Sequence, residues 1–211
     1  MELLQGIKNI IFDLGGVLLN LDPQKTIDAF QQFGMSSPLH AKTLTYNNEV
    51  FYEMEQGFIS PAEFRAKVNQ LLPKAISDEE IDDAWTAMML DFPESRIRIL
   101  KNLRPHYRLF LFSNTNAIHV ERFEENFRKE HGTDIQTFFD RVFYSNEIGY
   151  RKPDVSAFHE IIKLADIDPS ESIFIDDLEA NALGAKQAGL RTYWLKPEDQ
   201  FDLVFADYLH P

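Results

Sequence analysis

The stretch KNIIFDLGGVLL, residues 8–19, decides the fold of this 211-residue chain. Residues 8–12 are too few and too rich in β-branched side chains for a helix, so they predict a buried strand. The strand ends in Asp13, and the chain then turns through Gly15 and Gly16. An unpaired carboxylate at the end of a buried strand costs several kcal/mol. We therefore look for the partners of Asp13 at the ends of other strands.

The composition excludes several classes of protein. With 44% hydrophobic residues and 18 Phe, the chain can form one sizeable domain, or a core domain with a smaller insert. It has no cysteine, so disulfides and thiolate metal sites are excluded. The net charge of −13 argues against nucleic-acid and anionic-membrane partners, because both need a basic surface. There is no signal-peptide pattern and no apolar run near the roughly 20 residues of a membrane span, so we expect a soluble, cytoplasmic protein.

Strand and helix patterns alternate in the second half of the chain. After the strand at 8–12, the apolar patterns predict strands at 107–112, 141–144, 172–176 and 191–195, with helices at 94–103, 117–130, 154–165 and 179–188. Such alternation predicts an α/β fold, a Rossmann-like parallel sheet with helices on both faces.

Residues 17–91, which we call the cap, have a different pattern. Their apolar residues recur at spacings of three and four, and Ser77 with Glu80 forms the signature of a capping box. We find no strand pattern there, so the cap is predicted to be an all-helical insert. The expected organisation is an α/β core of residues 1–16 and 92–211, the cap at 17–91, and a short flap at about 14–22.

The predicted strands end in polar side chains of a few kinds: carboxylates, a hydroxyl, an amide and a lysine. These are Asp13, Ser113, Asn114, Lys152, Asp176 and Asp177. Ligands of open parallel sheets bind beyond these carboxyl ends. A carboxylate can attack phosphorus, Mg²⁺ can offset the repulsion between anions, and a lysine and a hydroxyl can hold phosphoryl oxygens. The strand ends therefore predict a Mg²⁺-dependent phosphoryl-transfer site.

The order of these residues resembles the haloacid dehalogenase-like hydrolase superfamily. The motifs FDLGGVLLNLD, FSNTNAIH, GYRKPDVSAFHEI and FIDDLEANALGA are most similar to bacterial glucose-1-phosphatase-like enzymes and the N-terminal phosphatase domain of soluble epoxide hydrolase. The resemblance implies that Asp13 is the nucleophile and a metal ligand. It also implies a role for the other strand-end residues: the Gly15 carbonyl, Asp177 and Asp176 as further metal ligands, Ser113, Asn114 and Lys152 as phosphate-binding residues, and Ser113 and Lys152 as part of the catalytic set.

Gly15 departs from the pattern of that superfamily. Its phosphatases usually carry a second aspartate here, which protonates the leaving oxygen and later activates water. Such acid–base help, typically worth about 100- to 10,000-fold, is missing at this position. Asp22 is the candidate replacement, although Asp before Pro23 is also a familiar start of a helix.

Three functions fit these residues. We predict a Mg²⁺-dependent phosphatase that hydrolyses a small phosphorylated metabolite, such as a sugar phosphate, through an aspartyl-phosphate. A 2-haloacid dehalogenase-type hydrolase would release halide without a proton, but it has no need of a metal pair such as Asp176 and Asp177. A catalytically weak regulatory or binding module has no reason to keep Asp13 and Lys152 beside that pair.

Other polar residues near the motifs are interpreted as structural or supporting. These are His119, Arg151 and Asn181. The aromatic residues of the segment 46–58 are expected to pack inside the cap rather than to hold a sugar.

Overall fold

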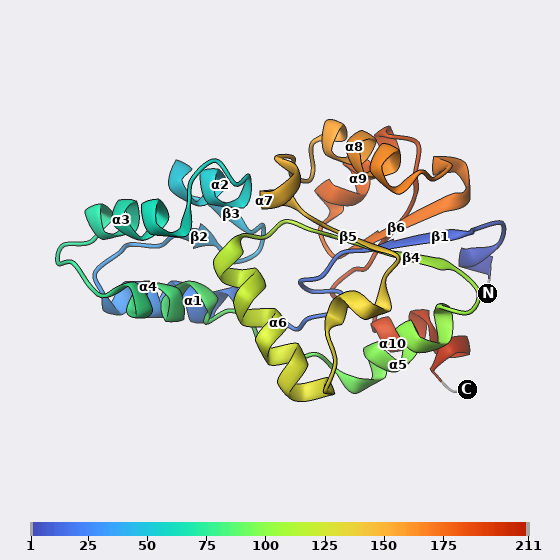
Figure 1. Cartoon of the computed structure of the whole chain (residues 1–211), viewed down its shortest axis with the longest axis horizontal. Coiled ribbons are helices and arrows are strands. Elements are labelled where there is room, and N and C mark those ends of the chain that lie inside the picture. The colour runs from blue at the N-terminus through green and yellow to red at the C-terminus, as the bar shows by residue number, and fades with distance from the viewer. Residues whose placement is uncertain (1, 210–211) are drawn as a thin grey trace.

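A five-stranded sheet lies at the centre of the computed structural model, which describes residues 2–209 (Figure 1). Its strands are β1 (Asn9–Phe12), β4 (Arg108–Ser113), β5 (Arg141–Tyr144), β6 (Ser172–Asp176) and β7 (Arg191–Trp194). They run in the order β5-β4-β1-β6-β7, and every neighbouring pair is parallel. The predicted parallel sheet is confirmed, and β1, which leads to Asp13, lies between β4 and β6.

Helices cover both faces of the sheet. The longer ones are α5 (Glu94–Leu103), α6 (Ala117–His131), α8 (Val155–Ala165) and α9 (Glu179–Gln187), with α7 (Ser145–Ile148) and α10 (Phe201–Val204) as short additions. Single turns of 3₁₀ helix occur at Glu2–Leu4, Ile135–Phe138, Pro169–Glu171 and Ala206–Tyr208. In Figure 1, α8 and α9 lie on one side of the sheet, and α5 and α10 lie on the other.

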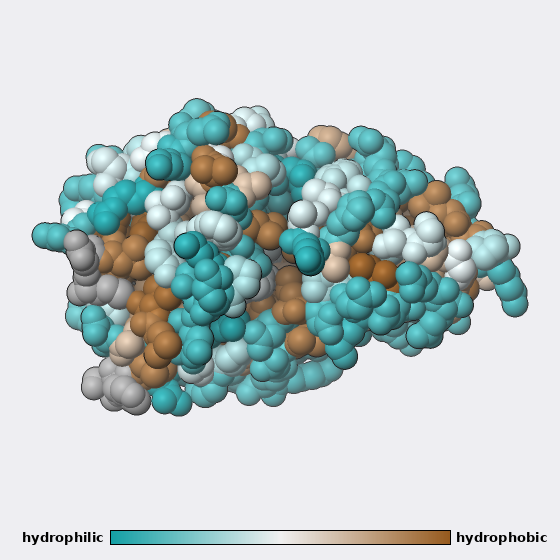
Figure 2. All heavy atoms as spheres, turned by 180° about the vertical axis from the view of Figure 1, so that it is seen from behind, coloured by the Kyte–Doolittle hydropathy of each residue, from teal (hydrophilic) through white to brown (hydrophobic). Residues whose placement is uncertain are grey.

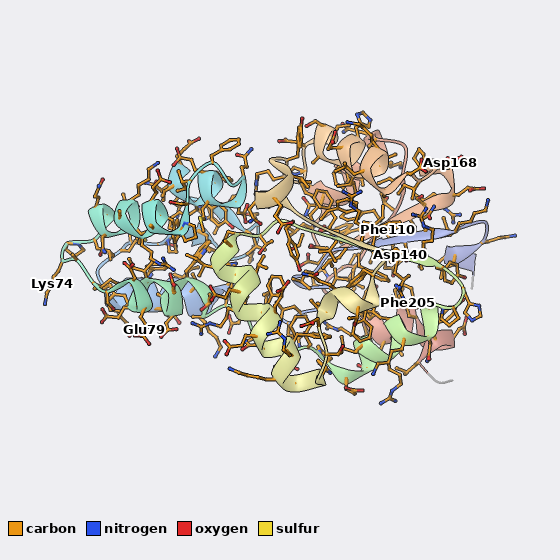
Figure 3. The ribbon with its side chains drawn as sticks, viewed as in Figure 1. Lys74, Glu79, Phe110, Asp140, Asp168 and Phe205 are labelled. Atoms are coloured by element: carbon orange, nitrogen blue, oxygen red, sulfur yellow. The ribbon has the colours of Figure 1, made fainter. Side chains whose placement is uncertain are left out.

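Successive strand residues supply two separate hydrophobic layers, as the period of two in a strand requires. Ile10 and Phe12 of β1 pack in the layer that contains Leu100 of α5 and Phe205, which is labelled in Figure 3. Ile11, between them, packs in the opposite layer with residues of α8 and α9. Strands buried on both faces have continuous apolar sequences, which is why NIIF could be recognised as a strand.

The cap forms a lobe beside the sheet. Its helices are α1 (Pro23–Gln32), α2 (Glu49–Glu55), α3 (Pro61–Leu71) and α4 (Asp78–Thr86), and the capping box of Ser77 and Glu80 is present. The prediction that the cap contains no strand is wrong, because β2 (Leu39–His40) and β3 (Thr45–Tyr46) form a small antiparallel pair. Two-residue strands are too short to show the alternation on which a strand prediction depends.

Trp85 is the centre of the hydrophobic cluster of the cap. It is fully buried, and the rings of Phe51 and Phe64 lie 4.9 and 5.8 Å from it. Ile118 of α6 belongs to the same cluster, so the cap packs against the start of that helix. Lys74, between α3 and α4, marks the end of the cap that is remote from the sheet (Figure 3).

The surface is mainly hydrophilic on the face seen from behind. Hydrophilic residues cover most of the face shown in Figure 2, and the hydrophobic residues on it form separate patches. Among residues 2–209, no helix combines the length and the apolar character that a membrane span requires.

Candidate active site

Three carboxylates meet at the carboxyl ends of β1 and β6. Asp13, Asp176 and Asp177 each offer an oxygen, and these oxygens lie within 4.8 Å of one another. The backbone N–H of Asp13 donates to the carbonyl of Ile175 at 2.9 Å, which holds the end of β1 against β6. Asp13 and Asp176 are buried. Oxygen ligands of this kind suit Mg²⁺, Ca²⁺ or Mn²⁺.

One lysine contacts two of these carboxylates. The Lys152 ammonium lies 2.7 Å from Asp13 Oδ1 and 2.8 Å from Asp176 Oδ2, and only 1% of its side chain is exposed. It also lies 5.3 Å from the ring centre of Phe112 and 5.1 Å from that of Phe174. Burial lowers the pKa of Lys152, but its pairing with the two carboxylates outweighs this and raises the pKa above its usual value. Lys152 is therefore a cation at neutral pH.

The charges of this cluster do not balance. Burial raises the pKa of Asp13 well above its usual range, although Lys152 opposes the shift. Burial and the neighbouring Asp176 raise the pKa of Asp177 to about 7. The cluster contains three carboxylates and one ammonium, so a divalent cation bound among the carboxylates would balance their negative charge.

Ser113 and Asn114, at the end of β4, have different contacts. Ser113 is buried at the end of the strand, and its hydroxyl makes only a long contact of 3.4 Å, to the carbonyl of Asn114. The Asn114 amide exchanges two hydrogen bonds with the backbone of Lys152, at 2.8 and 2.9 Å. Asn114 thus positions Lys152, and its role in phosphate binding stays a prediction. The N-cap of α6 is Asn116.

The two glycines after Asp13 each have a side chain close to the place that a Cβ would take. A Cβ on Gly16, whose φ is +75°, would lie 2.2 Å from Asp177 Oδ2. A Cβ on Gly15 would lie 2.5 Å from Leu21 Cδ1. The position at which the resemblance leads us to expect a second aspartate is therefore covered by an aliphatic side chain.

A cavity of about 330 Å³ opens above Asp13 and extends to the cap. Its wall includes predicted site residues from the end of β1, the end of β4 and the loop after α7: Asp13, Gly15, Ser113, Asn114 and Lys152. Asp22 is not among the lining residues. It is the N-cap of α1, where its carboxylate accepts a hydrogen bond of 3.1 Å from the N–H of Gln24. The capping role of Asp22 is observed, and its acid–base role stays a prediction.

A polar cluster of Tyr46, Glu55 and Arg151 lines the same cavity and was not predicted. The Tyr46 hydroxyl donates to Glu55, and the Arg151 guanidinium binds Glu55 Oε2 through Nε at 3.1 Å and Nη2 at 3.0 Å. Glutamate is usually a surface residue, so the residue type alone does not indicate that Glu55 is buried. One signal was available, because Glu55 follows Phe51 by four positions on the buried side of α2.

The remaining residues that were interpreted as structural have structural contacts. Asn181 donates to both oxygens of Asp176, at 3.0 and 3.1 Å. His119 stacks on Trp85 at a centroid distance of 4.7 Å and bonds to its carbonyl through Nε2 at 3.0 Å. Burial lowers the pKa of His119 to about 4.

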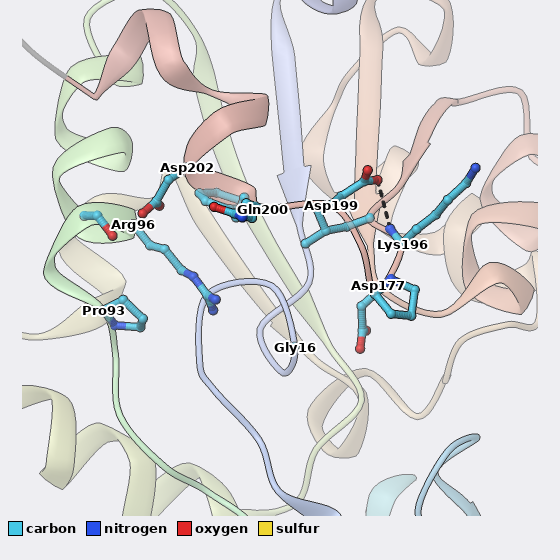
Figure 4. A pocket seen from close by; sticks show the side chains of 12 residues that line it. Gly16, Pro93, Arg96, Asp177, Lys196, Asp199, Gln200 and Asp202 are labelled. Carbon is cyan, nitrogen blue, oxygen red and sulfur yellow. Dashed lines mark hydrogen bonds between the residues drawn. The ribbon is translucent and has the colours of Figure 1, made fainter.

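A second cavity, of about 550 Å³, lies on the other side of the turn at Gly16 (Figure 4). Asp177 and Gly16 form one part of its wall, and Arg96 points toward Gly16 from the other. The backbone N–H of Lys196 donates to Asp199 there, at 3.1 Å. The carboxylate cluster thus stands between two cavities, with Asp13 lining the first and Asp177 lining the second.

The comparison with known proteins places this site in a family. The family model described as haloacid dehalogenase-like hydrolase matches residues 7–189. The chain belongs to the haloacid dehalogenase-like hydrolases. The resemblance of its motifs to this superfamily is therefore confirmed, whereas the narrower group and the catalytic role of Asp13 stay predictions.

Three relatives of this hydrolase are phosphatases or were crystallised with phosphate. It is 30% identical over 197 residues to D-ribitol-5-phosphate phosphatase of Bacteroides thetaiotaomicron, covering 93% of this chain and 94% of that protein. It is 25% identical over 223 residues to glyceraldehyde 3-phosphate phosphatase of Pyrococcus furiosus, covering 96% and 87%. A structure of a family enzyme from Bacteroides thetaiotaomicron in complex with magnesium and inorganic phosphate superimposes with a TM-score of 0.84 and 34% identity, covering 94% and 99%.

Proposed function

We propose that this hydrolase is a Mg²⁺-dependent phosphatase of a small phosphorylated metabolite, such as a sugar or polyol phosphate. The observation that carries the proposal is the contact of a buried lysine, Lys152, with a buried carboxylate, Asp13, at the floor of a cavity. The magnesium and phosphate bound by a relative, and the phosphatase names of two others, support it.

The residues at the strand ends have distinct tasks in this proposal. Asp13 attacks phosphorus, so that an Asp13–phosphorus bond forms while the bond from phosphorus to the alcohol oxygen breaks. Lys152 and the Ser113 hydroxyl stabilise the charge on the transferring phosphoryl group. Water then attacks phosphorus, the bond from phosphorus to the Asp13 oxygen breaks, and inorganic phosphate leaves with the Asp13 carboxylate restored. Asp13, the Gly15 carbonyl, Asp176 and Asp177 would hold Mg²⁺, which would supply positive charge to this anionic site.

The covered Gly15 position has a consequence for the choice of substrate. Residue 15 is glycine and the Leu21 side chain lies beside it, so position 15 supplies no acid to protonate the leaving oxygen. Esters with better leaving groups, such as sugar 1-phosphates and p-nitrophenyl phosphate, are therefore expected to react faster than polyol phosphates, whose leaving oxygen needs a proton.

A screen of phosphate esters, with Mg²⁺ and with EDTA, tests the function. We expect Mg²⁺-dependent release of phosphate from sugar and polyol phosphates, and none from the Asp13→Asn variant, whose fold is checked by circular dichroism. Phosphatase activity of that variant, or undiminished activity in EDTA, would overturn the mechanism. Halide release from 2-haloacids in EDTA would favour the dehalogenase instead.

A further inference from the structure

We propose that Glu55 makes this active site selective for substrates whose only charged group is the phosphate to be removed. The remainder of the substrate is a short, neutral, hydroxyl-bearing chain. The inference rests on the proposed phosphatase function. It concerns the polar cluster of Tyr46, Glu55 and Arg151, which lies on the wall of the cavity that also contains Asp13.

The polar cluster joins the cap to the core. Tyr46 belongs to β3 and Glu55 to α2, so both come from the cap, whereas Arg151 precedes Lys152 in the core. A phosphate held at Lys152 and Asp13 would extend its leaving group into the rest of this cavity. The polar cluster is therefore placed to contact the leaving group.

The charged side chains along the cavity wall are paired with one another. Among its lining residues in the described chain, the cations at neutral pH are Lys152 and Arg151, because His119 stays neutral. Lys152 is paired with Asp13, and Arg151 is paired with Glu55 at 3.0 Å. A second phosphate or a carboxylate on the substrate would find Arg151 already neutralised and would approach the buried charge of Glu55. Such a like-charge approach is a way of rejecting a ligand.

Glu55 is bound through both its side chain and its backbone. Its side chain is held by Tyr46 and Arg151, and its backbone carbonyl accepts a hydrogen bond of 2.7 Å from the Ser145 hydroxyl of the core. The Arg151 guanidinium also lies 4.8 Å from the centre of the Tyr52 ring. Glu55 is therefore bound at both ends, and turning away to release Arg151 to an anionic substrate would break its contacts with Tyr46 and Arg151.

The cavity wall also carries groups that can bind a neutral ligand. Glu55 and Tyr46 carry oxygen atoms that can bind hydroxyl groups. The rest of the nearby wall is mainly aliphatic, with Leu21, Leu44 and Met89 available to contact a carbon chain. A volume of about 330 Å³ is near the lower limit of ligand cavities, which limits the substrate to a small molecule.

The test compares two substrates that differ only in the group at the far end, a neutral CH₂OH in glycerol 1-phosphate and a carboxylate in 3-phosphoglycerate. Glu55→Gln keeps the shape of the side chain but frees the charge of Arg151. We expect it to raise the ratio of kcat/KM for 3-phosphoglycerate over glycerol 1-phosphate by about tenfold or more, the equivalent of about 1.4 kcal/mol. The double variant with Arg151→Met should lose this gain, because the cation is absent.

A matched control lies on the same helix. Glu53 of α2 pairs with Lys67 of α3, and both side chains are partly exposed. Glu53→Gln therefore removes the same charge from a residue that does not line the cavity. Its ratio should equal that of the wild type. An unchanged ratio in folded Glu55→Gln, or an equal loss of both activities, would overturn the selectivity and leave Glu55 with a structural role.

Two further outcomes are decisive. If the wild type shows no Mg²⁺-dependent hydrolysis of either substrate or of p-nitrophenyl phosphate, the phosphatase function fails and the selectivity fails with it. If p-nitrophenyl phosphate is hydrolysed but the variants do not change the ratio, only the selectivity fails. A wild-type preference for prenyl phosphate over glycerol 1-phosphate would overturn the binding of hydroxyl groups.

Discussion

Replacement of Lys152 by methionine isolates the charge at the centre of the site. Methionine fills a similar volume between Phe112 and Phe174, so the loss of packing is small. The substitution leaves Asp13, Asp176 and Asp177 within 4.8 Å of one another without the ammonium that now contacts two of them. Both the stability and the chemistry of the protein should respond.

The magnitude follows from the burial of the contact. Removal of one partner from a buried ion pair typically costs about 3–5 kcal/mol, a large part of the roughly 5–15 kcal/mol that stabilises a domain. For the metal-free protein, the pKa of Asp177 is raised to about 7, so the folded state holds a proton that the unfolded state has lost between about pH 4 and 7. Stability must therefore fall as the pH rises through this window, and the loss in the variant should be larger at pH 8 than at pH 5.

Urea unfolding in EDTA at pH 5 and pH 8 measures this loss, and a second series with Mg²⁺ measures its recovery. Saturation at about 100 times the Kd returns about 2.7 kcal/mol. Turnover should fall by at least about 100-fold, as for the loss of a donor to the transition state. A variant of wild-type stability whose turnover is within about threefold of normal would refute the placement of Lys152 in the site.

Three further perturbations test separate residues. The pKa of His119 is lowered to about 4, so protonation of His119 favours the unfolded state as the pH falls from 6.5 to 4. In urea titrations, His119→Gln should remove up to about 3 kcal/mol of the loss in unfolding free energy over this pH range. Equal pH profiles of the wild type and the variant would contradict this. Gly16→Ala should raise the Mg²⁺ concentration for half-maximal activity at least about tenfold by displacing Asp177. Gly132→Ala, at a φ of +68° with open space around it, is the control for backbone strain, and an equal effect of the two would count against the contact. Asp22→Asn should leave turnover and stability unchanged, since asparagine also caps helices; a burst followed by slow turnover in stopped-flow assays would make Asp22 the catalytic base.

The sheet could be predicted from the sequence because its strands are buried on both faces. NIIF and SIFID have continuous apolar runs that end in a carboxylate, and the strands at 141–144 and 172–176 have the predicted limits. The pair β2 and β3 could not be predicted, since its strands have two residues each and are held by neighbouring elements rather than by a pattern. The limits of the core and the cap stay a prediction.

The site shows the same division between local and distant contacts. Asp13 and Lys152 could be placed together because parallel strands bring their carboxyl ends to one edge. The pairing of Glu55 with Arg151 joins residues 96 positions apart through the packing of α2 on the core, and nothing in the local sequence of either residue records it. The same packing makes Tyr46 both a part of the cap's aromatic cluster and a part of the cavity wall, although we expected only the first.

The two tryptophans give the molecule a built-in optical readout. Trp85 stacks on His119 where the cap meets α6, and the indole N–H of Trp194 donates to the carbonyl of Asp177 at 3.0 Å. Changes in indole emission will therefore report separately on the junction of the cap and on the carboxylate cluster. With Trp194→Phe, the remaining fluorophore would record any change at the junction of the cap and α6 during a single turnover, without any label attached to the protein.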